Sequence, residues 1–165
     1  MKKALFAPWR MDYVKDASKG ISTCVFCSIQ HEKDETKSLI LYQTKQCMIV
    51  MNRYPYAYGH IMIIPKKHTK NLMELSDTEL FDLFDLMRKS QEVLKKTFKP
   101  HGFNVGINFE RVAGAGIVDH LHVHIVPRWL GDVNFMPLMS EAKVISEHIQ
   151  ETFTKLSQAF KIYFN

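Results

Sequence analysis

The sequence of 165 residues has few of the residues that mark several protein classes. Its three cysteines cannot form the disulfide framework of a small secreted protein, because an odd count leaves one unpaired. Seven glycines and six prolines are too few for a fibrous or low-complexity protein. No run of roughly 18 apolar residues is present to span a membrane. We therefore expect a cytoplasmic protein in a reducing environment, with no membrane partner.

The sequence is rich in basic residues and in histidine. There are 22 Lys and Arg against 17 Asp and Glu, which gives a net charge of +5, and eight histidines. A basic balance favours polyanionic partners such as nucleotides or nucleic acid. The hydrophobic fraction of 46% is too high for a disordered chain and, at this length, predicts one compact domain.

The hydrophobic pattern predicts an α+β fold with a mainly antiparallel sheet of about five strands. Apolar or alternating segments predict a hairpin over 39–52 and further strands at 59–65, 103–109 and 121–127. Within the single domain 1–165, we expect an N-terminal segment (1–38), a core (39–138) and a C-terminal helix (139–165).

Two helices are predicted. Ser76 and Glu79 have the spacing of a capping box. The apolar stripe that follows consists of Leu80, Leu83, Phe84, Met87, Leu94 and Phe98. Pro100 and Gly102 end this helix. The last helix is expected from about Ser140 to Phe160.

The strongest single feature is a row of three alternating histidines, His120, His122 and His124. On a strand all three rings would share one face, while the residues between them would face the core. A core rarely has three titratable rings in a row where Val or Thr would serve. A single metal bound by all three is opposed by geometry, because the outer two backbones would be roughly 13 Å apart.

Nucleophilic catalysis is the interpretation that fits the row. A neutral imidazole can attack phosphorus when its other nitrogen donates to a fixed acceptor. Flanking histidines can bind the oxygens of the phosphate in transfer. His60 stands at the start of the predicted strand 59–65, where it would be a packing residue or a cleft residue, and we favour packing.

The sequence resembles the histidine triad superfamily, whose signature of alternating histidine and apolar residues matches His120 to Val126 at every position. Further segments are similar to the Fhit-like bacterial branch, which includes diadenosine tetraphosphate phosphorylases. These segments are 7–11, 24–27, 52–60, 113–117, 127–129, 131–132 and 134–136. The resemblance covers roughly residues 4 to 138.

The resemblance implies roles for individual residues. His122 would be the nucleophile that takes up the nucleoside monophosphate, and His124 would contact the α-phosphate and help the leaving group depart. Asn52 matches the asparagine that holds the ribose. Asn108, with the turn from Gly114 to Gly116, matches the site that binds phosphate oxygens. The resemblance also implies a homodimer with sheets joined across a two-fold axis.

Cys24 and Cys27 form half of a common zinc-binding pattern, although a redox pair or two buried thiols can have the same spacing. A redox site of the thioredoxin kind would need a βαβ context that is absent here. By the resemblance, His68 and His120 match the third and fourth ligands of zinc-bearing members. The implied cofactor is therefore a structural zinc held by two cysteines and two histidines.

Two positions depart from the family pattern. Glu110 stands where relatives usually have glycine, and Val133 stands where threonine is common. A carboxylate near the polyphosphate would weaken anion binding unless Arg111 pairs with it.

The function expected is a nucleotidyl hydrolase or transferase. It would attack the α-phosphate of dinucleoside polyphosphates through a nucleotidyl-histidine intermediate that water or phosphate resolves. The alternative is a nucleotide-binding or partner-binding module with incidental turnover. Nucleic acid is not expected as a partner, because no additional binding module fits in the remaining residues.

Overall fold

The computed structural model describes residues 24–132 and 147–165. The predictions for segments 7–11 and 134–136, for Val133 and for the beginning of the last helix fall outside these ranges. None of the helices in the described ranges combines the length and the apolar character needed to cross a lipid bilayer.

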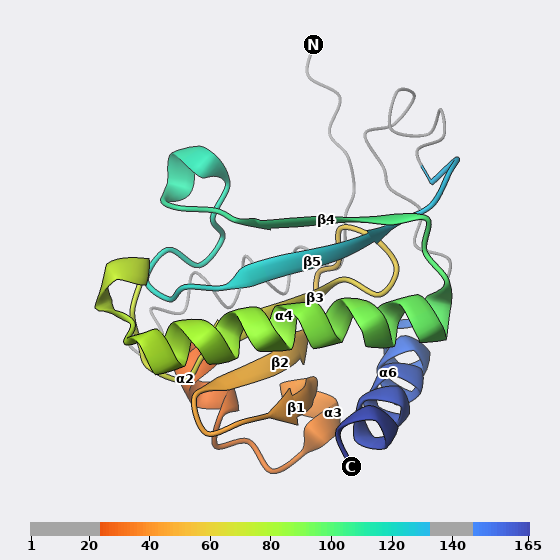
Figure 1. The fold of residues 1–165 in the computed structure, drawn as a ribbon, viewed down its shortest axis with the longest axis horizontal. Coiled ribbons are helices and arrows are strands. Elements are labelled where there is room, and N and C mark those ends of the chain that lie inside the picture. Colours follow the sequence, from red (N-terminus) through yellow and green to blue (C-terminus); the bar gives the residue numbers. More distant parts are fainter. Residues whose placement is uncertain (1–23, 133–146) are drawn as a thin grey trace.

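A five-stranded antiparallel sheet forms the centre of the molecule (Figure 1). Its strands are β1 (Ile40–Gln43), β2 (Cys47–Met51), β3 (Ile61–Pro65), β4 (Gly102–Ile107) and β5 (Val123–Arg128). Their order across the sheet is β1-β2-β3-β5-β4, and every neighbouring pair is antiparallel. The α+β fold with about five strands is therefore confirmed.

The middle of the sheet is the most deeply buried part. Every residue of β2 and β3 is buried, because helices or loops cover both faces there. β3 pairs with β5 so that Met62 lies opposite His124. β4 forms the edge beyond β5, and its middle residues, Asn104 to Gly106, are exposed. The sheet therefore presents β5 between a buried neighbour and an open edge strand.

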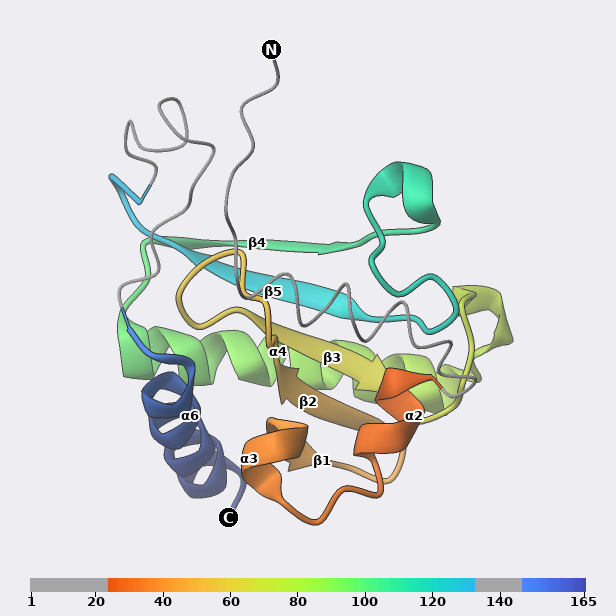
Figure 2. The same cartoon turned by 180° about the vertical axis from the view of Figure 1, so that it is seen from behind.

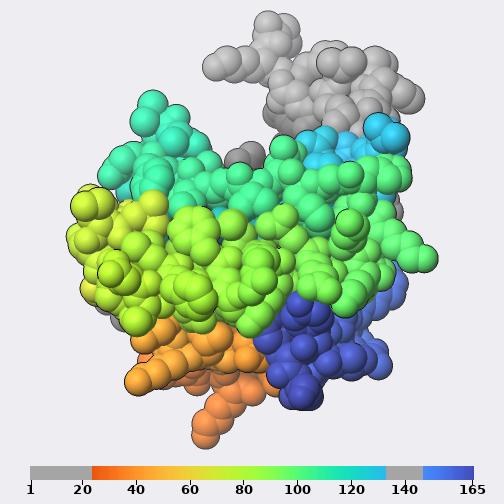
Figure 3. All heavy atoms as spheres, viewed as in Figure 1, coloured from red at the N-terminus to blue at the C-terminus, as the bar shows by residue number. Residues whose placement is uncertain are grey.

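The long helix α4 (Asp77–Phe98) covers one face of the sheet (Figures 1 and 3). The predicted capping box is present: the Ser76 hydroxyl accepts from the Glu79 amide, and the Glu79 carboxylate accepts from the Ser76 amide. The predicted stripe is wrong at Phe84, which is 53% exposed. Leu86 and Val93 are buried instead, so the buried face lies further around the helix than predicted.

The last helix, α6 (Ile149–Phe164), has His148 as its N-cap and continues beyond Phe160, where the prediction ended it. Its buried residues Leu156 and Phe160 join the core, where α6 lies against β1 and α4. The remaining helical segments are short: α2 (Val25–Ile29), α3 (Glu35–Ser38), η1 (Leu72–Glu74) and η2 (Arg111–Ala113). Seen from behind, α2 lies on the face of the sheet opposite α4 (Figure 2).

Candidate active site

The histidine row runs into β5 from the loop before it. His124 lies within β5, whereas His120 and His122 come just before its first residue. Leu121, Val123 and Ile125 belong to the hydrophobic core, as the alternation predicts. The rings of His122 and His124 are 4.8 Å apart between centroids. All three histidines are nevertheless buried, which a row lining an open wall would not be.

The short helix α2 supplies part of this burial. The ring of Phe26 lies 5.5 Å from that of His120 and 5.2 Å from that of His122, between centroids. Phe26 is itself buried in the core. The rings of His120 and His122 are therefore packed against an apolar ring, which helps to fix their positions.

His122 has one nitrogen committed to the backbone. Its Nδ1 lies 2.8 Å from the carbonyl oxygen of His120. A carbonyl only accepts, so Nδ1 carries the proton and donates, and Nε2 keeps its lone pair. Burial lowers the pKa of His122, which the hydrogen bond to His120 partly offsets, so the ring is neutral near pH 7. The result is a neutral imidazole with a fixed tautomer and a lone pair on Nε2.

His124 is oriented by His60, a residue that we interpreted from the sequence as packing. The His60 side chain is 0% exposed, and its Nε2 lies 2.9 Å from Nδ1 of His124. The backbone amide of Tyr56 donates to Nδ1 of His60 over 3.0 Å. Because Nδ1 of His60 accepts, its proton is on Nε2, which donates to His124.

The tautomer of His124 follows from this chain of hydrogen bonds. Its Nδ1 accepts from His60, so its own proton is on Nε2. That Nε2 is buried and has no hydrogen-bond partner in the described part of the chain. Burial, followed by the neighbouring His122, lowers the pKa of His124 to about 4. His124 therefore presents a neutral N–H donor beside the lone pair of His122.

Asn52, the predicted ribose ligand, lies near this network. Its Oδ1 accepts from the Tyr54 amide over 2.9 Å, and its Nδ2 is 3.3 Å from Nδ1 of His60. The side chain thus stabilises the turn that follows β2 and contacts the residue behind His124. The structure brings Asn52 to the His124 end of the row.

The four predicted metal ligands come together at the other end of the row. Cys24, Cys27, His68 and His120 each offer one atom, and these atoms lie within 4.8 Å of one another. Nδ1 of His120 is 3.2 Å from the Cys24 sulfur, 3.6 Å from the Cys27 sulfur and 3.3 Å from Nδ1 of His68. Nδ1 of His68 is 3.4 Å from the Cys27 sulfur.

These separations fit tetrahedral coordination. Zinc at its usual distances from sulfur and nitrogen places neighbouring ligand atoms roughly 3.3–3.8 Å apart. Nε2 of His120 lies 2.8 Å from the Pro65 carbonyl, so Nε2 donates and Nδ1 turns its lone pair toward the other three ligands. A histidine ligand with its second nitrogen bonded to a carbonyl is common at metal sites. The two cysteines are free thiols.

The predicted phosphate-binding turn connects β4 to β5. Gly114 has φ +94°, a left-handed conformation that glycine adopts without strain, and it ends η2. Nδ2 of Asn108 lies 3.8 Å from where a Cβ on Gly114 would be, so these two predicted residues are adjacent. Gly116 is exposed and shows no positive φ. The role of these residues stays a prediction.

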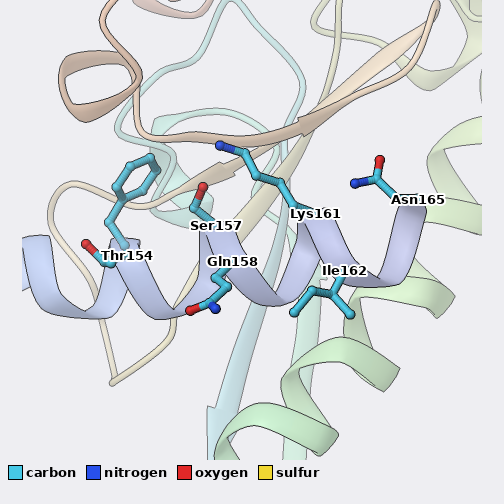
Figure 4. Close-up of a pocket in the computed structure, with 7 residues that line it drawn as sticks. Thr154, Ser157, Gln158, Lys161, Ile162 and Asn165 are labelled. Carbon is cyan, nitrogen blue, oxygen red and sulfur yellow. The ribbon is translucent and has the colours of Figure 1, made fainter.

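A hollow elsewhere on the surface has different chemistry. One side of α6, from Phe153 to Asn165, lines it (Figure 4). Lys161 at its rim pairs with Glu35 over 3.1 Å. The residues that line it include no histidine or cysteine.

Comparison with protein families gives a match to the HIT domain over residues 33–131. AP-4-A phosphorylase of Mycobacterium tuberculosis is 37% identical over 155 residues, covering 90% of this chain and 79% of that protein. The asymmetrical bis(5'-nucleosyl)-tetraphosphatase of Schizosaccharomyces pombe is 38% identical over 95 residues, covering 58% of this chain and 52% of that protein.

Solved structures share the fold. The crystal structure of a hypothetical histidine triad nucleotide-binding protein from Sulfolobus tokodaii superposes with a TM-score of 0.66 at 28% identity. The match covers 85% of this chain and 91% of that one. The sheet and helices described above are therefore the same architecture.

Proposed function

The chain belongs to the HIT family, and on that premise we propose that it is a nucleotidyl hydrolase or transferase acting on dinucleoside polyphosphates. Its relatives that are named as a phosphorylase and a tetraphosphatase support this substrate class. The observation that carries the proposal is the pair of adjacent rings with opposite hydrogen-bonding character. His122 offers a lone pair at Nε2, and His124 offers an N–H at Nε2.

The first step forms a bond between Nε2 of His122 and the α-phosphorus of the substrate. The bond from that phosphorus to the bridging oxygen of the leaving group breaks, and the leaving group takes the electron pair. Nε2–H of His124 donates to an oxygen of the reacting phosphate or to the departing oxygen. The imidazolium that forms at His122 keeps its proton on Nδ1 and donates it in a hydrogen bond to the His120 carbonyl, which stabilises the positive charge.

The second step reverses the first with a different acceptor. Water or inorganic phosphate attacks the same phosphorus, and the bond to Nε2 of His122 breaks. The electron pair of that bond returns to Nε2, so His122 is neutral again, and an attacking water loses a proton to solvent as the nucleotide product forms. With water the enzyme is a hydrolase, and with phosphate it is a phosphorylase.

Zinc is the metal that the four-residue group fits. Cys24, Cys27, His68 and His120 would hold it in a closed site that leaves no position open for substrate. Bound there, the metal would supply structural stability rather than chemistry. Its effect on the reaction is indirect, because it would fix His120, whose carbonyl orients His122. Free thiols in such a site also support a reducing, cytoplasmic location.

A homodimer is supported by the open edge of the sheet. β4 is the edge strand, and Val105 in its middle is 41% exposed. An exposed edge strand can pair with a second copy of itself and extend the sheet. The variant Val105→Lys should shift the molecular mass in solution from dimer to monomer, whereas Ile162→Lys on exposed α6 should not. A native chain that sediments as a monomer would contradict this part of the proposal.

The reaction is tested with diadenosine tetraphosphate, with and without phosphate. AMP and ATP as products indicate hydrolysis, and ADP and ATP that appear only with phosphate indicate phosphorolysis. His122→Ala should lose turnover while retaining nucleotide binding, measured by calorimetry. Turnover of this and related nucleotides that is unchanged in His122→Ala would overturn the catalytic role and leave a nucleotide-binding module.

A further inference from the structure

Glu110 has a backbone conformation that is unusual for a residue with a side chain. Its φ is +62° and its ψ is +166°, a region that essentially only glycine occupies. Two other described residues besides glycine have a positive φ, Leu39 and Lys99, and both are ordinary left-handed ends of helices. Glu110 alone among the described residues combines a side chain with a glycine-only conformation.

The loop around Glu110 enforces this conformation. The Glu110 carbonyl accepts from the Ala113 amide over 3.2 Å and from the Ala115 amide over 3.3 Å. These bonds form the turn that carries η2 and Gly114 at the end of the sheet where β5 begins (Figure 1). The backbone shape therefore belongs to the turn, and a glycine would adopt it without strain.

The Glu110 side chain does not compensate for that strain. Its Oε1 lies 3.7 Å from Nζ of Lys70, and the two side chains are 61% and 58% exposed. An exposed ion pair contributes less to stability than a glycine-only conformation costs a residue with a side chain. The ion partner is Lys70 rather than Arg111, the partner considered from the sequence. The presence of a carboxylate here is therefore not explained by folding.

The ion pair lies beside the histidine row. Lys70 directly follows Thr69, whose carbonyl accepts from the Leu121 amide over 2.6 Å, and Leu121 stands between His120 and His122. On the other side, Glu110 belongs to the same turn as Asn108 and Gly114. A polyanion that extends from the row to the turn of Asn108 and Gly114 would come within the electrostatic screening length of this carboxylate, roughly 8–10 Å in salt.

We propose that Glu110 is a specificity-determining residue that makes this enzyme favour nucleotide conjugates whose leaving group carries few negative charges. The inference rests on the proposed function and ranks the substrates of that same site, from phosphoramidates to dinucleoside polyphosphates, by the charge of the leaving group. Each additional phosphate in the leaving group adds about one negative charge that Glu110 repels and that Lys70 only partly balances. The strain at Glu110 is then the consequence of placing a negative charge on a turn shaped for glycine.

The test compares three substrates that share adenosine 5'-phosphate but differ in leaving-group charge. These are adenosine 5'-phosphoramidate, diadenosine triphosphate and diadenosine tetraphosphate. Glu110→Gln removes the charge and keeps a side chain, so it should raise kcat/KM for the tetraphosphate relative to the phosphoramidate by about 3–10-fold. Raising the salt concentration should shrink this change.

Two further variants separate charge from backbone strain. Glu110→Gly should change the substrate ratio as Glu110→Gln does, and it should also raise the melting temperature by about 2–6 °C by relieving the strain. Glu92→Gln is the control for removal of a carboxylate charge elsewhere, because Glu92 forms an exposed ion pair with Lys96 on α4 and also accepts from the Tyr163 hydroxyl of α6. It should leave the substrate ratio unchanged.

The outcomes distinguish this inference from the proposed function. Turnover that depends on His122 but keeps the same substrate ratio in Glu110→Gln would overturn the inference alone. The same would follow if Glu92→Gln changed the ratio equally. Absence of turnover that depends on His122 for all three substrates would overturn the proposed function and this inference together.

Discussion

His60 and His124 give the sharpest prediction, because two conservative substitutions separate the hydrogen bonds of His60. In His60→Asn, the amide oxygen can still accept from the Tyr56 amide, but no donor reaches Nδ1 of His124. In His60→Gln, the longer amide can still donate to His124 but loses the acceptor for Tyr56. The two variants remove opposite ends of one hydrogen-bonded chain.

The expected magnitudes follow from burial. A hydrogen bond lost inside the protein, with its partner left unsatisfied, costs about 1–3 kcal/mol. If the lost hydrogen bond stabilises the transition state, its absence raises the activation free energy by that amount, and kcat decreases by roughly 5–150-fold. His60→Asn should show this decrease, since nothing then holds the proton of His124 on Nε2. His60→Gln should stay within about threefold of the native kcat and lose its 1–3 kcal/mol in stability instead.

The assay combines steady-state turnover of diadenosine tetraphosphate with urea unfolding of both variants. A positioning role for His60 requires that kcat falls more in His60→Asn and that the free energy of unfolding falls more in His60→Gln. If both variants lost kcat equally, or if kcat only followed stability, His60 would be a packing residue and the tautomer argument would be refuted.

Three further predictions concern the rest of the molecule. The pKa of His124 falls from 6.5 to about 4 in the fold because burial penalises the charged ring, so the unfolded chain binds that proton first as pH drops. Stability should be full above about pH 6.5 and decrease toward pH 4 by up to about 3 kcal/mol for this group. A urea midpoint that rises on acidification from pH 7.5 would contradict it. Gly59→Ala should lose about 1–3 kcal/mol by chemical unfolding, since φ is +68° and a Cβ would lie 2.9 Å from the Phe98 ring. Purified protein should contain one zinc per chain, and Cys24→Ser or a strong chelator should lower its melting temperature; freely alkylated Cys24 and Cys27 without zinc would exclude the site.

Local patterns were sufficient for much of this fold. The hairpin of β1 and β2 and the capping box of α4 depend on neighbouring residues, so the sequence carries them directly. The alternation around His122 likewise placed the apolar residues in the core. The exposure of Phe84 was not predictable from the sequence. Two overlapping apolar stripes on α4 could each face the core, and only packing against the sheet decides which of them is buried.

Long-range contacts limited what could be said of the site. Of the four predicted metal ligands, Cys24 and Cys27 follow from a local pattern. His68 and His120 were assigned by resemblance, since Cys27 and His120 are 93 residues apart and no local pattern joins them. His60 was missed because its partner is brought to it by the pairing of β3 with β5. A glycine followed by histidine before a buried strand gives no signal of this partner. Glu110 was noticed as a departure, but its backbone conformation became visible only in the turn itself.

The three histidines of the row differ only in what stands behind each ring. Nε2 of His120 donates to a carbonyl, so its Nδ1 lone pair faces the cysteine sulfurs. Nδ1 of His122 donates to a carbonyl, so its lone pair is on Nε2. His60 donates to Nδ1 of His124, so Nε2 of His124 is a donor. The row therefore has a direction along the chain, from the proposed metal ligand through the proposed nucleophile to the proposed proton donor. A substrate bound along it can react in one orientation only, and exchanging a group behind a ring would change that ring's role without altering any residue of the triad.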